Sequence, residues 1–204
     1  MMSKTHITVG IAASLAVCRP STIGGVLASI AGGAIGGVFC DIECKSTPEM
    51  RDALYGRLIA AGIAGGMLAL DAILHSGIWI SILSQDRFLL GLSAIVLIVT
   101  CLIGRFSEHR TFTHSILFVL LVTFGFFCLT DVFLFPVLAG GLSHLIIDTF
   151  NKKPVPWLYP LRKKGICFYV CYASKIGNTI LMWVGLAGSI LLLGWRIMSI
   201  TGRL

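Results

Sequence analysis

The amino-acid sequence predicts an all-α fold: a polytopic integral membrane bundle of about five to seven membrane helices, arranged as consecutive helical hairpins. Of its 204 residues, 56% are hydrophobic and only 12% are charged, about half the charged share of an average soluble domain. The mean hydropathy is +0.93, and the 23 glycines suit the close helix–helix approach that small residues allow in a bilayer. This composition excludes intrinsic disorder, which needs low hydrophobicity and high net charge.

The apolar residues are gathered into stretches that we assign to a single membrane-embedded domain, residues 1–204. The stretches fall at about 7–18, 21–40, 58–83, 88–104, 114–130, 132–150 and 177–195. A spanning helix needs about 20 apolar residues. The stretches 58–83, 88–104 and 177–195 are therefore each expected to cross the membrane once, the last as a C-terminal membrane helix.

Two longer apolar regions, 7–40 and 114–150, exceed the length of a single span. Arg19-Pro20 interrupts the first region, and Asp131 with Pro136 interrupts the second. Each region is therefore predicted to be a helical hairpin. The short segment at the start of the first region, 7–18, and the one at the end of the second, 132–150, could alternatively be re-entrant.

The hairpin pattern predicts which loops share a face. One face receives the N-terminus and the loops 41–57, 105–113 and 151–176, and these carry twelve of the sixteen lysines and arginines. Because an excess of Lys and Arg marks cytoplasmic loops, we expect this face in the cytoplasm. The basic loop 151–176 also contains Trp157, which favours the headgroup level. This loop is interpreted as a topology determinant or, alternatively, as a grip on an anionic substrate.

The net charge of +7 does not indicate a nucleic-acid partner. The basic residues form no stripe interleaved with aromatic residues, and no helix-turn-helix or zinc-finger spacing occurs. The expected partner is the lipid bilayer, and no nucleic acid is expected.

Seven titratable side chains fall on the predicted cytoplasmic face, namely His6, Asp41, Glu43, His109, His114, His144 and Asp148. The strongest local signal is the pair His144 and Asp148, whose i,i+4 spacing places both on one helical face about 5–6 Å apart. Such a pair can bind one divalent cation, or the carboxylate can orient the imidazole. A polar pair that stabilises a helix end is the alternative.

A second signal is the box from Glu108 to Ser115. His109 is expected in a loop and His114 in the first turn of the next helix, which Thr111 or Thr113 would cap. The two histidines can then converge on one ion, and Arg110 between them offers a bidentate fork for phosphate or carboxylate. An ordinary polar loop is the alternative.

Weaker signals complete the candidate site. Asp41 and Glu43 follow a Gly/Ala-rich helix, so one is expected to ligate while the other bridges or acts as a base; a solvated loop is the alternative. His6 has the weakest case. Asp71 and His75 form another i,i+4 pair inside 58–83, interpreted as a mutually satisfied structural pair or, alternatively, a proton relay.

The sequence contains no serine-nucleophile elbow, phosphate-cradling glycine loop or Walker motif, so a metal-activated water is the most economical chemistry. Mixed histidine and carboxylate ligands suit Zn²⁺, with Mn²⁺ as an alternative. The predicted ligands are Asp41, His109, His114, His144 and Asp148. His6 and Glu43 are predicted as auxiliary ligands or acid/base groups, and Arg110 is predicted to steady an anionic substrate.

At these residues the chain resembles the YdjM-like family of LexA-regulated bacterial inner-membrane proteins, described as predicted metal-dependent hydrolases. The resemblance covers residues 1–160, the family-like core. It rests on His6, Cys40-Asp41-Ile42-Glu43, the box His109–Ser115, and Ser143–Asp148 followed by Pro154–Pro160. It implies an inner-membrane location, a link to the SOS response, and hydrolysis of a phosphoester or a phospholipid headgroup. The chain departs from the family pattern at Cys40, Glu43 and Thr111, where the family has proline, aspartate and glycine.

Two alternatives to an enzyme follow from the same residues. A non-enzymatic membrane scaffold or stress-response protein would use the ligands for a structural metal, whose coordination is closed. A small transporter would place Asp71, His75 and Asp131 along one internal channel, although the sequence shows no evident inverted repeat.

Overall fold

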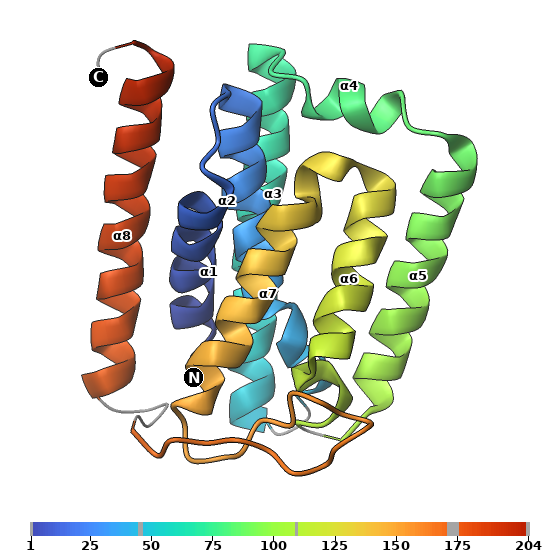
Figure 1. Ribbon diagram of the computed structural model, residues 1–204, viewed down its shortest axis with the longest axis vertical. Coiled ribbons are helices and arrows are strands. Elements are labelled where there is room, and N and C mark those ends of the chain that lie inside the picture. Colours follow the sequence, from blue (N-terminus) through green and yellow to red (C-terminus); the bar gives the residue numbers. More distant parts are fainter. Residues whose placement is uncertain (1, 45–46, 109, 171–175, 203–204) are drawn as a thin grey trace.

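The computed structural model describes residues 2–44, 47–108, 110–170 and 176–202, and within them the chain is an all-α bundle, as predicted (Figure 1). Three short 3₁₀ turns join its helices: η1 (Cys40–Glu43), η2 (Phe112–His114) and η3 (Asp131–Phe133). The helices are α1 (Ser3–Cys18), α2 (Ile23–Phe39), α3 (Thr47–Leu74), α4 (Ile78–Leu83), α5 (Arg87–Phe106), α6 (Ile116–Leu129), α7 (Leu134–Thr149) and α8 (Ile176–Ile200).

Five segments of the described chain are long and apolar enough to cross a membrane. They are Ile23–Glu43, Met50–Leu74, Arg87–Phe106, Asp131–Thr149 and Ile176–Ile200. Most of the segments that contain α2 and α7 is buried inside the protein, whereas α3, α5 and α8 leave most of their apolar surface exposed. That exposed surface is what a helix presents to lipid. The bundle is therefore a multi-pass membrane protein with α2 and α7 at its centre.

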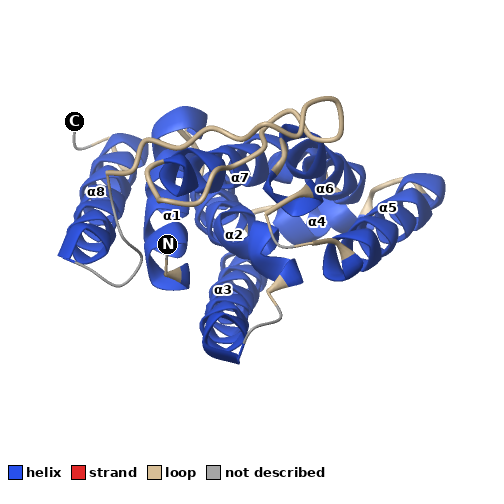
Figure 2. Cartoon of the chain, turned by 90° about the horizontal axis from the view of Figure 1, so that it is seen from below, coloured by secondary structure: helices blue, strands red, loops and turns tan. Residues whose placement is uncertain are grey.

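Close packing of small residues builds this centre. Helix α2 packs against α1, α3 and α7, and Figure 2 shows it in the middle of the bundle seen end-on. A Cβ atom added at Gly36 would lie 2.5 Å from the carbonyl oxygen of Val137 on α7. Only glycine at position 36 lets the two backbones approach this closely, which is the role small residues take in membrane bundles.

One predicted span is wrong in its extent. Residues 58–83 were expected to form one helix, but α3 begins at Thr47 and ends at Leu74, and α4 is a separate short helix. The chain turns at Gly77, whose φ of 109° favours glycine. Asp71 stabilises the turn by accepting hydrogen bonds from the backbone N–H groups of Ile78 (3.0 Å) and Trp79 (2.9 Å).

The predicted pairing of loops agrees with the arrangement of the helices. The N-terminus and the loops after α2, α5 and α7 lie at one end of the bundle, whereas α4, the turn between α6 and α7, and the C-terminus lie at the opposite end (Figure 1). We call the first end the loop end. The segment 150–170 crosses it, held by an antiparallel bridge between Val155 and Ile166 and by the N–H of Ile116, which donates to the carbonyl oxygen of Trp157 (2.9 Å).

Candidate metal centre

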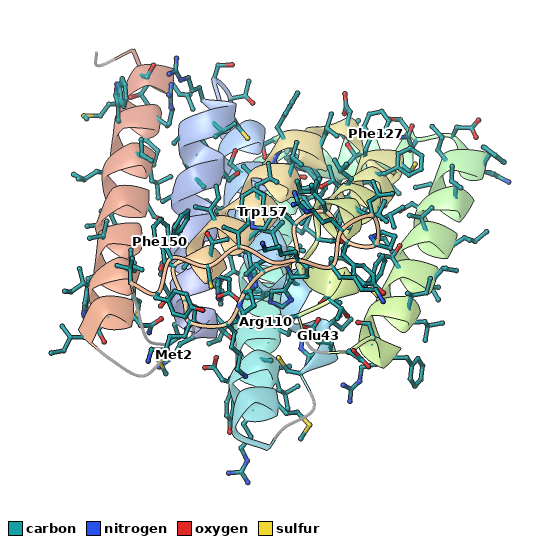
Figure 3. All side chains as sticks on the ribbon, turned by 60° about the horizontal axis from the view of Figure 1, so that its bottom comes forward. Met2, Glu43, Arg110, Phe127, Phe150 and Trp157 are labelled. Carbon is teal, nitrogen blue, oxygen red and sulfur yellow. The ribbon has the colours of Figure 1, made fainter. Side chains whose placement is uncertain are left out.

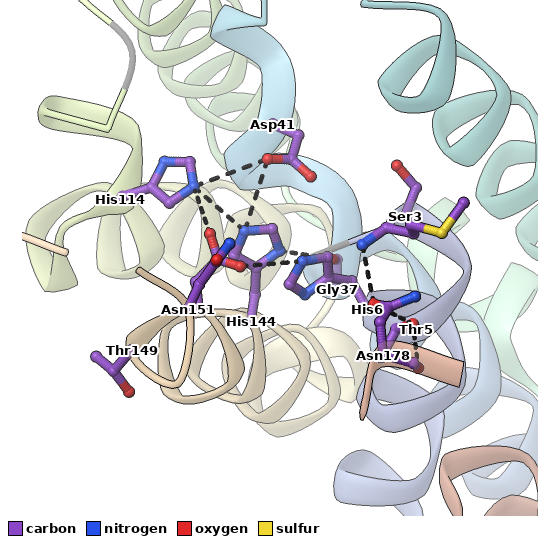
Figure 4. Close-up of polar contacts among 12 residues, drawn as sticks. Ser3, Thr5, His6, Gly37, Asp41, His114, His144, Thr149, Asn151 and Asn178 are labelled. Carbon is purple, nitrogen blue, oxygen red and sulfur yellow. Dashed lines mark hydrogen bonds and ion pairs between the residues drawn. The ribbon is translucent and has the colours of Figure 1, made fainter. Parts of the chain in front are cut away.

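Four elements meet at the loop end and bring the predicted site residues together. Helix α1 supplies His6, η1 at the end of α2 supplies Asp41 and Glu43, η2 supplies His114, and α7 supplies His144 and Asp148. Figure 4 shows the imidazoles of His6, His114 and His144 and the carboxylate of Asp41 gathered in one place. His109 lies outside the described residues. His114 was expected in the first turn of a helix capped by Thr111 or Thr113. Instead it lies in η2, and Ser115 caps α6, since its hydroxyl accepts from the N–H of Phe118 (3.2 Å).

The side chain of His144 is fixed by the backbone of α2. Its Nδ1 lies 2.7 Å from the carbonyl oxygen of Gly37, so Nδ1 carries the proton and donates a hydrogen bond to that oxygen. The lone pair on Nε2 then faces the cluster, 3.5 Å from Nε2 of His114 and 3.8 Å from Oδ1 of Asp41. A metal-binding histidine that donates its other N–H to a backbone carbonyl is a recurrent arrangement.

His114 is oriented in the same way by Glu43. Nδ1 of His114 lies 3.0 Å from Oε1 of Glu43, while its Nε2 lies 3.7 Å from Oδ1 of Asp41 and 3.4 Å from Oδ2 of Asp148. The same Glu43 oxygen accepts a hydrogen bond from the backbone N–H of Arg110 (3.0 Å). Glu43 therefore contacts the side of the imidazole away from the cluster, the position of an orienting carboxylate rather than of a ligand.

Asp148 lies between the histidines and the predicted arginine. Its Oδ1 is 3.4 Å from Nε2 of His6, and its Oδ2 is 2.9 Å from Arg110. The ring of His6 stacks on that of His144 with centroids 3.8 Å apart. Nδ1 of His6 is buried and has no hydrogen-bond partner in the described part of the chain, and a buried polar nitrogen of this kind usually binds a ligand or an ordered water.

The distances fit a metal ion. Oδ1 of Asp41, Nε2 of His114 and Nε2 of His144 form a triangle with sides of 3.5, 3.7 and 3.8 Å. A point equidistant from the three atoms lies about 2.1 Å from each, which is the length of a bond from zinc to histidine nitrogen or carboxylate oxygen. A second group, of His6, His144 and Asp148, also has its ligand atoms within 4.8 Å of one another.

The electrostatic potential of the cluster favours a cation. Burial of His114 opposes its charged form, but hydrogen bonds to Asp148 and Glu43 and the charges of these carboxylates outweigh burial and raise the pKa of His114 to about 10. A site that holds a proton this strongly on a buried imidazole also attracts a divalent ion, which would replace that proton.

Arg110 closes one side of the cluster. Figure 3 shows it next to the labelled Glu43 and close to the segment 150–170. Besides its ion pair with Asp148, its guanidinium donates to the carbonyl oxygen of Lys153 (2.8 Å). Its Nε is buried without a hydrogen-bond partner among the described residues. The guanidinium therefore keeps one donor available next to the cluster.

Sequence reasoning missed the backbone groups that hold the site. The carbonyl oxygens of Gly37 and Lys153 orient His144 and Arg110, and a backbone carbonyl leaves no signature in a sequence. Thr113 was predicted only as a helix cap, but its hydroxyl lies 3.1 Å from Nδ1 of His114. Its position directly before the histidine was the one available signal.

Three further residues named in the sequence analysis lie away from the site. Asp71 binds Ser76 and the start of α4, and His75 is exposed, so the i,i+4 pair does not form. Asp131 is exposed at the turn between α6 and α7. These three residues do not line one internal path, which was the prediction of the transporter hypothesis.

Fold and site together define a polytopic helical membrane protein with a buried histidine–carboxylate cluster at one end of its bundle. The family model for the YdjM inner membrane protein matches residues 1–202, and the chain belongs to that family. The match confirms the resemblance seen in the motifs and extends it beyond residue 160. No curated protein and no solved structure matches the chain.

Proposed function

We propose that this inner-membrane protein is a metal-dependent hydrolase that acts on a phosphoester or lipid-headgroup-like substrate at the cytoplasmic face. The observation that carries the proposal is the triangle of Asp41, His114 and His144, whose three ligand atoms are equidistant from a point about 2.1 Å away. Mixed nitrogen and oxygen donors favour Zn²⁺, with Mn²⁺ as the alternative.

A divalent ion at this point would lower the pKa of a water molecule and polarise a phosphoryl oxygen. The chain's own residues would supply the remaining functions. Asp148 and His6 lie next to the triangle and would complete the coordination or accept a proton. Arg110, with an unpartnered Nε beside Asp148, would bind an anionic oxygen of the substrate, since the planar guanidinium matches phosphate geometry.

The exposure of the cluster favours a catalytic over a structural metal. The side chains of His114, His144 and Asp148 are at most 2% exposed, whereas that of Asp41 is 14% exposed. A structural site is closed on all sides, whereas a catalytic site keeps one open position. The open edge at Asp41 is where a substrate would enter.

Metal analysis tests the proposal. The full chain, purified in detergent, is expected to contain about one equivalent of zinc or manganese or more, and the double variant His144→Ala/Asp148→Ala is expected to lose it. The matched control is His75→Ala/Asp131→Ala, which removes the same two residue types from the opposite end. Equal trace metal in the wild type and in the site variant would refute the metal centre.

Activity is tested on the same samples. Wild type loaded with metal is expected to hydrolyse a chromogenic phosphodiester or a phospholipid, and the site variant is expected to be inactive. Hydrolysis at equal rates by both would exclude this cluster as the catalytic site, and metal binding without hydrolysis of any phosphoester would favour the structural alternative.

A further inference from the structure

An apolar groove lies beside the metal centre, between α2, α3 and α6. It has a volume of about 260 Å³ and is lined by seven apolar side chains and one arginine, Arg57. This volume is below the 300–1,000 Å³ of sites for whole drug-sized ligands, so it suits a single slender apolar group. Ala61 of α3 lies in its wall and is exposed, so the groove is open on a helix surface that faces lipid.

The groove adjoins the element that carries the site carboxylates. Ile42 lines the groove, while its two neighbours in η1, Asp41 and Glu43, both contact His114. One short turn thus separates the apolar groove from the polar cluster.

Arg57 gives the groove a charged end. Its Nε donates to the carbonyl oxygen of Ala53, one turn closer to the start of α3 (3.1 Å), which directs the side chain toward the loop end. Its other guanidinium nitrogens have no partner among the described residues. An apolar groove with a guanidinium in its wall is complementary to an acyl chain attached to a phosphate-bearing headgroup.

The aqueous side of the centre is covered by protein. The segment 150–170 crosses the ends of α6 and α7, opposite α3, when the bundle is viewed from the loop end (Figure 2), and its Lys153 carbonyl binds Arg110. The groove therefore lies on the other side of η1 from this covering segment. It offers a lateral path from the bilayer to the site.

We propose that the substrate of the metal centre is a membrane glycerophospholipid, whose acyl chain occupies this groove and whose phosphate is held by Arg57 at its polar end, next to Asp41. The proposal rests on the proposed hydrolase function and adds the substrate class and its route of entry. The reaction consumes one water molecule: the water oxygen forms a bond to phosphorus and loses a proton, the P–O bond to the leaving group breaks, and the leaving alkoxide takes up a proton. The phosphate then remains on the other fragment as a monoester.

Photo-crosslinking tests the occupant without requiring turnover. Full-length protein in nanodiscs is irradiated with phosphatidylglycerol that carries a diazirine on one acyl chain, and the adducts are mapped by mass spectrometry. Adducts are expected on residues 35–42 and 57–61. Ala61→Trp, which fills the groove, is expected to lower the yield of these adducts about tenfold. A tenfold loss of affinity corresponds to the acyl chain losing the burial of roughly two methylene groups. Ala94→Trp, at an exposed position of α5, is the matched control and should leave the yield unchanged.

Two comparisons identify the substrate. Unlabelled phosphatidylglycerol should compete for the adducts, whereas diacylglycerol, which lacks phosphate, should compete poorly, and Arg57→Gln should remove this difference. Ala61→Trp should also slow hydrolysis of a long-chain lipid but not of a water-soluble glycerol phosphodiester, with unchanged metal content.

Several results would overturn the proposal. Adducts spread evenly over all lipid-facing helices and insensitive to Ala61→Trp would show annular lipid only. Equal competition by diacylglycerol would exclude recognition of phosphate, and an equal loss of both hydrolytic activities would exclude the groove as an acyl-chain site. Groove adducts with no phosphoester hydrolysis by metal-loaded wild type would refute the hydrolase itself, so the two failures are distinguishable.

Discussion

Replacing Glu43 by glutamine is predicted to weaken binding of a divalent metal without abolishing it. Glu43 is buried, and its Oε1 contacts Nδ1 of His114 and the backbone N–H of Arg110, both at 3.0 Å. Glutamine has the same size but no charge. The variant therefore removes the charged acceptor behind the imidazole while leaving the predicted ligand atoms in place.

The expected magnitude follows from the two contacts. Hydrogen bonds to a charged group contribute about 1.5–3 kcal/mol, and glutamine keeps a weaker carbonyl acceptor. Loss of an outer carboxylate that orients a ligating histidine typically lowers metal affinity about 10- to 100-fold, which corresponds to about 1.4–2.8 kcal/mol. The two ranges agree, so we expect Glu43→Gln within this interval.

Affinity is measured by competition between the metal-free protein in detergent and a fluorescent zinc chelator. Glu108→Gln is the control, because Glu108 is exposed at the same end of the bundle and the substitution changes charge identically. Affinity of Glu43→Gln within twofold of wild type would refute the orienting role. Complete loss of metal, as in His144→Ala/Asp148→Ala, would show instead that Glu43 is itself a ligand.

Three further outcomes are expected. The pKa of His114 is raised to about 10 in the metal-free protein, so this histidine must lose a proton when metal binds. The apparent association constant for zinc should therefore rise about tenfold per pH unit between pH 7 and 9. An association constant that does not change with pH in the chelator assay would contradict this. Trypsin should cleave at residues 162–164 in inside-out vesicles and not in right-side-out vesicles, and the reverse pattern would place the site outside the cytoplasm. Asp71→Ala should lower stability by about 1–2 kcal/mol through loss of a helix cap, seen as a lower Tm with unchanged metal content; loss of metal would instead connect Asp71 to the site.

Much of the fold follows from composition and from the places where apolar stretches are interrupted. Arg19-Pro20 and Asp131 do mark turns of two hairpins, because a charge and a proline are both costly in a membrane helix interior. The break at Gly77 escaped prediction because 58–83 was assigned as one apolar stretch, although His75-Ser76-Gly77 lies within it. The turn after α3 depends on the positive φ of Gly77 and on the hydrogen bonds of Asp71, and a hydropathy pattern shows neither of these features.

The sequence predicts which side chains gather at one end of the bundle, but not how each of them is oriented there. The pattern of consecutive hairpins alone places residues from distant segments at one end of the bundle, because the chain reverses its direction after each helix. The hairpin pattern determines only at which end of the bundle a residue lies. The role of its side chain depends on which of its atoms faces the cluster. Glu43 illustrates this difference, since its sequence position beside Asp41 suits a ligand, but its contact with Nδ1 of His114 makes it an orienting group.

The glycines that indicate a membrane bundle are also the reason that the histidine–carboxylate cluster can form. The carbonyl oxygen of Gly37 accepts the hydrogen bond that orients His144, and the absence of a side chain at Gly37 lets α1 pack closely against α2. A Cβ atom there would collide with the carbonyl oxygen of His6. Helix α1 could then no longer bring His6 to stack on His144 at 3.8 Å.

Gly37→Ala is therefore predicted to weaken metal binding about tenfold or more, although it removes no ligand. A functional site tolerates displacements of only about 0.5 Å, and a methyl group where α1 crosses α2 forces a larger displacement. Gly65→Ala on α3 is the control, since a Cβ atom there meets nothing within 4 Å, and alanine in a helix stabilises by up to about 1 kcal/mol. If Gly37→Ala lowers the Tm but binds zinc as tightly as wild type in the chelator assay, packing and ligand geometry are separable. If its affinity falls and that of Gly65→Ala does not, the spacing of α1 and α2 sets the geometry of the centre.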